Sequence, residues 1–331
     1  MSAGQAYKFA VSVHIVLCSN LPTKGNFDNI IQPPLWIGTF VISGSELERI
    51  ARKLVADSGK GRIAPRAFRE AAPTIAEQIV RDADSPLLQL WGKSRNFDEF
   101  ARDVIVHPKL LTVIGALANV KIRDGRAYHA GLIHTYGYLF SWLPTPYGFK
   151  RERWLNHAIE DGLGIPRRTI VAEPRAGTLL QNLSWCLAHI ALNDCPAWKR
   201  IRTTPNDVPA ALRDLSFDGL KTRRITERVN LTDAGGRRKI ELCTDLVALH
   251  AKPNRQADLT LIVYSAKDAQ QGGRKLVSAF TTETANIRAL CHSQAMGRNK
   301  PIRPRYNCYI EGFPSEPILG IRSLAPQRRL S

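Results

Sequence analysis

The sequence predicts an α+β protein, with a helical N-terminal and central part that includes a short N-terminal sheet, followed by a C-terminal antiparallel sheet of about four strands. Apolar residues recur mostly at helical spacing over residues 43–193, and from about residue 222 they form short runs separated by turn residues. We expect residues 1–125 to form an α/β N-terminal region. Residues 126–331 should form a helical core with the sheet and a basic C-terminal tail, either as a second unit or as one continuous domain.

Two apolar segments near the N-terminus are expected to be strands. Strict alternation predicts a half-buried strand at residues 9–17, and an apolar run predicts another at residues 35–42. The Ser-Gly-Ser-Glu segment that begins at Ser43 has the form of a capping box, in which serine and glutamate side chains satisfy backbone N–H groups at a helix start. Gly59 and Gly61 should end this helix.

Three further helices are expected before the centre of the chain. The helix at residues 73–82 opens on a proline, which suits the first helical position. An Asn-Phe-Asp-Glu segment is expected to cap a helix at residues 96–105, and apolar residues predict a short buried helix at residues 110–118. The Asp-Gly pair within residues 123–126 predicts a tight turn.

A long segment without Asp, Glu, Lys or Arg, residues 127–149, lies at the centre of a chain in which such residues are 23% of the total. Its apolar spacing predicts a helix with a broad apolar face, beside a polar stripe that holds His134 and Tyr138. Two prolines should end this helix. A membrane span is the alternative, but two histidines and several hydroxyls would be costly in lipid, so we expect a core helix and no membrane span.

A second uncharged run, residues 176–193, predicts another helix with an apolar stripe and with Asn182 and His189 on one polar seam. Polar side chains that face a core need hydrogen-bond partners. We therefore expect this seam to face the polar stripe that holds His134 and Tyr138.

Between these runs, residues 149–159 are expected to form a helix that is closed by glycines. Its first turn holds three cations, Lys150, Arg151 and Arg153. Cations at this position oppose the helix dipole, and a bound anion at the helix N-terminus would resolve the conflict. A nearby carboxylate could balance the cations instead.

Two antiparallel hairpins are expected in the C-terminal part. Residues 225–231 and 237–250 flank one turn that contains two glycines, and residues 259–265 and 275–282 flank another. A helix at residues 284–296 and a tail rich in proline and arginine should follow.

The composition fits a folded, basic protein. Hydrophobic residues make up 44% of the chain, enough for a sizeable core, and the formal net charge is +18. This charge favours an acidic partner, either an anionic small molecule or a nucleic acid, and does not predict an oligomeric state. The six cysteines lack C-x-x-C spacing, which favours reduced thiols in a cytoplasmic protein over disulfides or a zinc site.

The histidines of the central segment are the candidate catalytic groups. His134 is suited to general acid or base catalysis, with Tyr138 and His129 beside it, because imidazole titrates near neutral pH. The alternative is a buried histidine that bonds a neighbour and has no catalytic role. His129 and His134 fall on different faces of a regular helix, so no metal site is expected. The alternative is a segment that begins as a strand and turns helical near Gly131, in which the two histidines could converge. No cofactor is expected, since no nucleotide-binding or hydrolase motif is present.

Two functions from different classes fit these features. The first, which we favour, is a cofactor-independent hydrolase or transferase that acts on an anionic substrate by histidine-based acid–base catalysis. Its substrate would be bound by Lys150, Arg151, Arg153, Asn182 and His189. The second is an RNA-binding or single-strand-binding protein that uses its basic C-terminal half.

The second function requires aromatic side chains that stack on bases. Tyr264 and Phe280 are the aromatic residues well placed on the predicted strands, which is few for a stacking surface. The C-terminal tail would add phosphate contacts and one further ring, from Arg298, Lys300, Arg303, Arg305 and Tyr306.

Overall fold

The structure of the chain is a computed structural model. It describes residues 35–37, 40–98, 101, 103–120, 127–145, 148–171, 177–202, 208–216, 220–233, 236–249, 259–268, 273–284 and 308–309. By internal contacts the chain divides into Met1–Gln32 and Pro33–Ser331, and all described residues belong to the second unit. The strand predicted at residues 9–17, the turn at 123–126 and the named tail residues lie outside the described residues. The helix at 284–296 does too, apart from its first residue, and the boundary after residue 125 stays a prediction.

The fold is α+β, as predicted. The described α-helices are α1 (Gly44–Asp57), α2 (Pro65–Ala71), α3 (Pro73–Arg81), α4 (Pro108–Leu117), α5 (Ala130–Leu132), α6 (Ala158–Leu163), α7 (Leu179–Ala191), α8 (Pro196–Ile201) and α9 (Ala210–Arg213). Two short 3-10 helices, η2 (Pro86–Leu90) and η4 (Lys150–Glu152), and a π-helical turn, η3 (Ile133–Gly137), accompany them.

The strands of the described residues form four antiparallel sheets. They are β1 (Leu35–Ile37), β2 (Phe40–Ile42), β3 (Lys93–Arg95), β4 (Ala127–His129), β5 (Pro144–Thr145), β6 (Gly148–Phe149), β7 (Thr222–Asp233), β8 (Gly236–Leu249), β9 (Leu259–Asp268), β10 (Arg274–Glu283) and β11 (Cys308–Tyr309). The largest sheet has the order β10-β9-β8-β7, and a smaller one has the order β11-β3-β4. The pairs β1-β2 and β5-β6 form two-stranded sheets, so the apolar run at residues 35–42 is a hairpin and not one strand.

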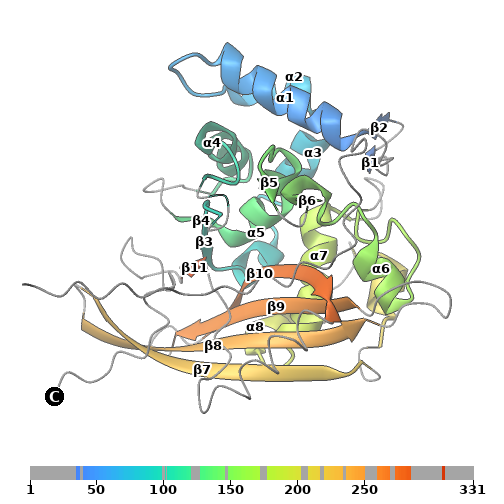
Figure 1. Cartoon of the computed structure of the whole chain (residues 1–331), viewed down its shortest axis with the longest axis vertical. Coiled ribbons are helices and arrows are strands. Elements are labelled where there is room, and N and C mark those ends of the chain that lie inside the picture. The colour runs from blue at the N-terminus through green and yellow to red at the C-terminus, as the bar shows by residue number, and fades with distance from the viewer. Residues whose placement is uncertain are drawn as a thin grey trace, which may run out of the picture. The chain divides into compact units, whose positions relative to one another are not determined.

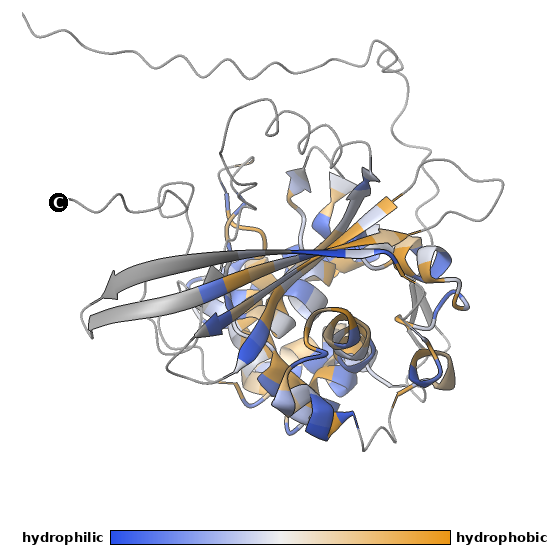
Figure 2. Cartoon of the chain, turned by 90° about the horizontal axis from the view of Figure 1, so that it is seen from below, coloured by the Kyte–Doolittle hydropathy of each residue, from blue (hydrophilic) through white to orange (hydrophobic). Residues whose placement is uncertain are grey.

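The four-stranded sheet confirms both predicted C-terminal hairpins. Figure 1 shows its strands side by side, with α5 and α7 next to β10 and with α1 and α2 far from the sheet. In Figure 2 the sheet is seen nearly edge-on, and most of the described helices lie on one side of it. Buried side chains such as Val247, Val263 and Ala279 belong to the same apolar core as those of α7.

Local sequence signals place most of the N-terminal helices correctly. Helix α1 begins after Ser43, whose Oγ accepts a hydrogen bond from the Glu46 backbone N–H (3.2 Å). The glutamate half of the predicted capping box pairs with Arg49 (2.7 Å). Helices α3 and α4 lie where the sequence predicted them, and each opens on a proline. Among the described helices, none is long and apolar enough to cross a membrane.

Two helix predictions are wrong. In place of a helix at residues 96–105, the described part of this segment is a loop that follows β3. The Asn96 side chain bonds both the N–H and the C=O of Val106, which closes this loop and removes the helix cap. The helix predicted at residues 149–159 is divided into η4 and α6, because His157 has a left-handed backbone conformation (φ 58°) between them.

Candidate active site

The central uncharged segment changes from strand to helix within a few residues. Strand β4 leads directly into α5 and then into the single π-helical turn η3. Gly131 lets this path run against Trp91, because a Cβ atom at position 131 would lie 2.8 Å from the indole ring. Single π-helical turns such as η3 occur often at functional sites. The rings of His134 and Tyr138, at and just after η3, lie 4.8 Å apart in an edge-to-face arrangement.

Both ring nitrogens of His134 face serine hydroxyls. Nε2 lies 3.2 Å from Ser94 Oγ in β3, and Nδ1 lies 3.4 Å from Ser278 Oγ in β10. The Trp91 ring stacks on the imidazole. Ser94 is buried and Ser278 is half-buried, so the contact at Nε2 is enclosed and the longer contact at Nδ1 is nearer to solvent.

Strand β10 contributes the Ser278 side chain and the Ala279 carbonyl to this site. Its register against β9 shifts between Leu276 and Ser278, and such bulges turn a side chain toward a new direction. It is also an edge strand of the four-stranded sheet, so its outer carbonyls are open to other donors. The Ala279 carbonyl accepts a hydrogen bond from Arg153 Nη1 (3.0 Å).

The Arg153 guanidinium lies among aromatic rings. Its Cζ is 4.9 Å from the centre of the Tyr138 ring and 5.5 Å from the centre of the Phe280 ring, distances typical of cation–π contacts. Tyr264 packs edge-on against Phe280, with ring centres 5.7 Å apart. Burial lowers the pKa of Arg153, and Tyr138 opposes this shift. The group still carries its charge at neutral pH, because arginine titrates far above it.

Lys150 and Asp98 form the ion pair of this site. Lys150 Nζ is 3.1 Å from Asp98 Oδ2, and the two side chains are 17% and 7% exposed. Burial, and then repulsion from Arg153, lowers the pKa of Lys150 to about 8, although Asp98 opposes the shift. An ammonium group with this pKa can donate a proton near neutral pH.

The protonation states suit proton transfer. Burial lowers the pKa of His134 well below its ordinary value, and the positive charges of Arg153 and Lys150 lower it further, so the imidazole is neutral at pH 7. Burial raises the pKa of Tyr138, so its phenol stays protonated and can donate a hydrogen bond. We call the following group the histidine site: Ser94, Asp98, His134, Tyr138, Lys150, Arg153 and Ser278.

Two predicted site residues next to this group have other partners. His129 contacts the Leu88 carbonyl through Nε2 (3.0 Å) and caps α5 through Nδ1. Arg151 is buried and pairs with Glu48 (2.8 Å). Of the three neighbouring cations, Lys150 and Arg153 therefore belong to the histidine site and Arg151 connects η4 to α1.

The two predicted residues on α7 also have other partners. The Asn182 side-chain amide donates to the carbonyls of Thr169 and Ile170 (both 3.2 Å). His189 packs against Trp185 and Trp198, with ring centres 5.2 and 4.8 Å away. The contacts that the structure gives these two residues do not support the expectation that their seam faces His134 and Tyr138.

A buried carboxylate links α7 to the central segment instead. Asp82, fully buried, accepts hydrogen bonds from the Tyr136 hydroxyl (2.6 Å) and from the Thr178 hydroxyl at the start of α7 (2.7 Å). Burial raises the pKa of Asp82 to about 6, although both hydrogen bonds oppose the shift. The uncharged segments therefore do share polar contacts, but through Tyr136.

Three members of the histidine site were not anticipated from the sequence. Ser94 and Ser278 lie far from His134 along the chain, and Asp98 belongs to the segment that was expected to start a helix. The one available signal was the cations of the 150–153 segment, which require a carboxylate or an anion when buried. The cations alone do not indicate which residue provides the carboxylate.

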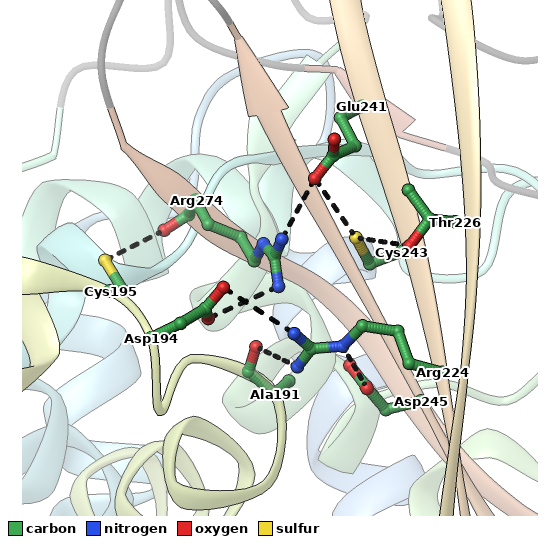
Figure 3. Close-up of polar contacts among 9 residues, drawn as sticks. All are labelled: Ala191, Asp194, Cys195, Arg224, Thr226, Glu241, Cys243, Asp245 and Arg274. Carbon is green, nitrogen blue, oxygen red and sulfur yellow. Dashed lines mark hydrogen bonds and ion pairs between the residues drawn. The ribbon is translucent and has the colours of Figure 1, made fainter.

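A second polar cluster joins the sheet to the segment after α7 (Figure 3). Arg224 pairs with Asp245 (2.6 Å) and with Asp194 (3.6 Å). Arg274 pairs with Glu241 (3.1 Å) and with Asp194 (3.4 Å). Burial raises the pKa of Asp245, and the hydrogen bond from Arg224 opposes the shift. We call these five residues the arginine network.

Within the part of the chain that the structure describes, no group of three His, Cys, Asp or Glu side chains is arranged to hold a metal ion. The histidine site offers a neutral base, an ammonium group that can donate a proton, a guanidinium and a protonated phenol. Such groups are suited to proton transfer beside a bound anion. Comparison of the chain with protein-family models, with curated proteins and with solved structures finds no match.

Proposed function

We propose that this chain is a cofactor-independent hydrolase or transferase that acts on an anionic substrate by acid–base catalysis at the histidine site. The observation that carries the proposal is a buried imidazole beside two cations, Lys150 and Arg153, for which the described part of the chain supplies one carboxylate in the site, Asp98. Cations in a largely buried place are costly unless they are balanced. An anionic substrate would supply the missing negative charge.

Each group has a distinct role in this proposal. His134 accepts the proton of the attacking hydroxyl or water, and Lys150 donates a proton to the leaving group. Arg153 binds the anion, and the Tyr138 phenol adds a hydrogen bond where negative charge develops. His129, Arg151, Asn182 and His189 are not assigned roles, because the contacts described above for them lie outside the histidine site.

The finer statements about location and partners are also proposals. We place the protein in the cytoplasm, since Cys186, Cys195 and Cys243 are buried, free thiols, as is usual in a reducing compartment. The partner is expected to be an anionic small molecule or a nucleic acid, which suits a chain with a net charge of +18.

Two measurements on the full chain test the enzyme. The first is turnover of p-nitrophenyl phosphate and bis(p-nitrophenyl) phosphate, which report on monoester and diester chemistry. The second is calorimetric binding of inorganic phosphate. We expect His134→Gln to lower turnover by about 10²–10⁴-fold, since a general base contributes that much. Arg153→Met should weaken phosphate binding.

A matched control is His107→Gln. His107 is half-buried, and its Nδ1 accepts a hydrogen bond from the Lys109 N–H at the start of α4. This variant should keep full turnover. Turnover that is unchanged in His134→Gln, or a wild-type chain that neither binds phosphate nor hydrolyses either ester, would contradict the proposal.

A further inference from the structure

We infer that the substrate is single-stranded RNA, and that the histidine site cleaves it by transferring a phosphodiester to the adjacent 2′-hydroxyl. This inference rests on the proposed function and names the substrate of the same site. Three features support it: an aromatic ring beside the guanidinium, an exposed cation on the same face of the sheet as that ring, and separate groups to accept and to donate a proton.

The first feature is the position of Phe280. Alternate residues of a strand point to the same face, so Ser278 and Phe280 share one face of β10 and lie roughly 7 Å apart. Ser278 contacts His134 Nδ1, and Phe280 contacts Arg153. Phe280 is half-buried and Tyr264 supports its ring from β9. A base that stacks on Phe280 would therefore place its phosphate near Arg153 and its ribose toward His134.

The second feature is the charge around this place. The chain as a whole carries +18, and Arg223 is exposed on β7. Arg223 pairs with Leu246, Leu246 with Ile262, and Ile262 with Phe280, so the Arg223 side chain lies on the same face of the sheet as Phe280. A polyanion that occupies the histidine site could extend across this face toward Arg223, which a small anion could not do.

The third feature is the chemistry of the two nitrogen groups. If Nε2 carries the imidazole proton and donates it to the enclosed Ser94 oxygen, the lone pair of Nδ1 points toward Ser278. The Ser278 contact is the longer and the less buried of the two, so a ribose 2′-hydroxyl can replace it. Lys150 lies close enough for its charge to lower the pKa of His134, and it is protonated at neutral pH.

The reaction balances with these two groups alone. His134 Nδ1 removes the proton of the 2′-hydroxyl, and the 2′-oxygen forms a bond to phosphorus. The bond from phosphorus to the 5′-oxygen breaks, and that oxygen takes a proton from the Lys150 ammonium. The products are a 2′,3′-cyclic phosphate and a free 5′-hydroxyl, and the imidazolium returns its proton to Lys150 through solvent.

The probe is a fluorescent DNA oligonucleotide that contains one ribonucleotide, incubated with the full chain and a chelator. An all-DNA oligonucleotide of the same sequence is the control for the 2′-hydroxyl. We expect cleavage at the ribonucleotide only, with a 2′,3′-cyclic phosphate identified by mass spectrometry. His134→Gln, prepared in the same way, should bind the probe with unchanged affinity and lose at least about 10²-fold in cleavage.

Two variants of Phe280 test whether its ring stacks on a base or only stabilises the fold. Phe280→Ala should raise KM by about tenfold, the effect of losing one stacked base, with kcat little changed. Phe280→Trp should restore KM, because it keeps an aromatic face at the same position.

The outcomes separate this inference from the proposed function. Intact probe, together with His134-dependent hydrolysis of the chromogenic esters, overturns RNA as the substrate and leaves the enzyme. Cleavage of the all-DNA strand, or products that lack the cyclic phosphate, overturns the transfer to the 2′-hydroxyl. A chain that turns over neither the probe nor the esters contradicts both.

Discussion

The histidine site and the arginine network each bring two cations to the four-stranded sheet, but they balance them differently. The network surrounds Arg224 and Arg274 with three carboxylates. Among the described residues, the histidine site gives Lys150 and Arg153 the single carboxylate of Asp98, and Arg153 also contacts aromatic rings and a backbone carbonyl.

This difference is consistent with a structural role for the network and with the functional role that we propose for the histidine site. Carboxylates that already surround an arginine leave no place for an anion, and they tie β7, β8 and β10 to the segment after α7. An excess of cations beside a neutral base leaves negative charge to be supplied from outside. Changes in the network should therefore affect folding, and changes in the histidine site should affect ligands and protons.

The largest effect is expected for Arg224→Met. This change leaves the Asp245 carboxylate, which is 4% exposed, without its arginine, and such a loss costs about 3 kcal/mol of the free energy of unfolding. The pKa of Asp245 is already raised, and it rises further without Arg224. Stability then falls as pH rises through that pKa, so urea denaturation should show a larger loss at neutral pH than at about pH 4.5.

The double variant Arg224→Met/Asp245→Leu tests the cause. Removing the isolated carboxylate should recover much of the lost free energy, because a buried pair can be replaced by apolar side chains at little cost. A double variant no more stable than Arg224→Met would show that the carboxylate is not the source of the loss.

The sheet that holds both clusters was predictable because its signals are local. Each C-terminal hairpin combines β-forming residues with a glycine-containing turn between the paired strands. The loop within residues 96–105 was not predictable in this way. Asn96 has the sequence signal of a helix cap, but its side chain bonds the backbone of Val106 in a loop. These hydrogen bonds to a residue ten positions along the chain outweighed the local preference.

The histidine site was predictable in part. An uncharged segment with a polar stripe pointed to His134 and Tyr138, and their neighbours Lys150 and Arg153 follow closely in the chain. Ser278 comes from a strand more than a hundred residues away, and a register shift in β10 aims its side chain. The spacing of residues in a sequence does not reveal a contact between such distant segments. The partners of a buried polar group could therefore be identified only from the structure.

The next largest effect is expected for Asp98→Asn. Lys150 then loses its carboxylate, which should cost about 2 kcal/mol at neutral pH. The pKa of Lys150 is lowered to about 8 by burial and is held up by Asp98, so it should fall below 8 in the variant. NMR titration of the lysine side chain measures it directly. A pKa that stays near 8 would mean that Asp98 does not support the charge of Lys150.

The same lysine gives stability a dependence on alkaline pH. The folded pKa of Lys150 lies below its unfolded value, so the unfolded chain binds more protons between about pH 8 and 10.5, and stability from this group rises with pH in that window. The rise should begin at lower pH in Asp98→Asn and be absent in Lys150→Met. The charged groups that act on Lys150 here are Asp98 and Arg153.

A smaller effect on folding is expected for Arg153→Met. Asp98 keeps Lys150 as its partner, so no buried carboxylate is isolated, and the loss of one hydrogen bond to Ala279 should cost about 1 kcal/mol. The pKa of Lys150 should rise, because repulsion from Arg153 is removed. A loss as large as that of Arg224→Met in urea denaturation would remove the distinction between the two clusters.

The smallest effect is the response to inorganic phosphate. A ligand that binds only the folded chain stabilises it by about 0.6 kcal/mol when its concentration is about twice Kd. We expect this gain in thermal unfolding of the wild type and of Arg224→Met, since the network leaves no place for an anion. Arg153→Met should show no gain, because the guanidinium that would bind phosphate is missing. A gain that is lost in Arg224→Met and kept in Arg153→Met would assign the anion to the network, and the excess of cations at the histidine site would then need another explanation.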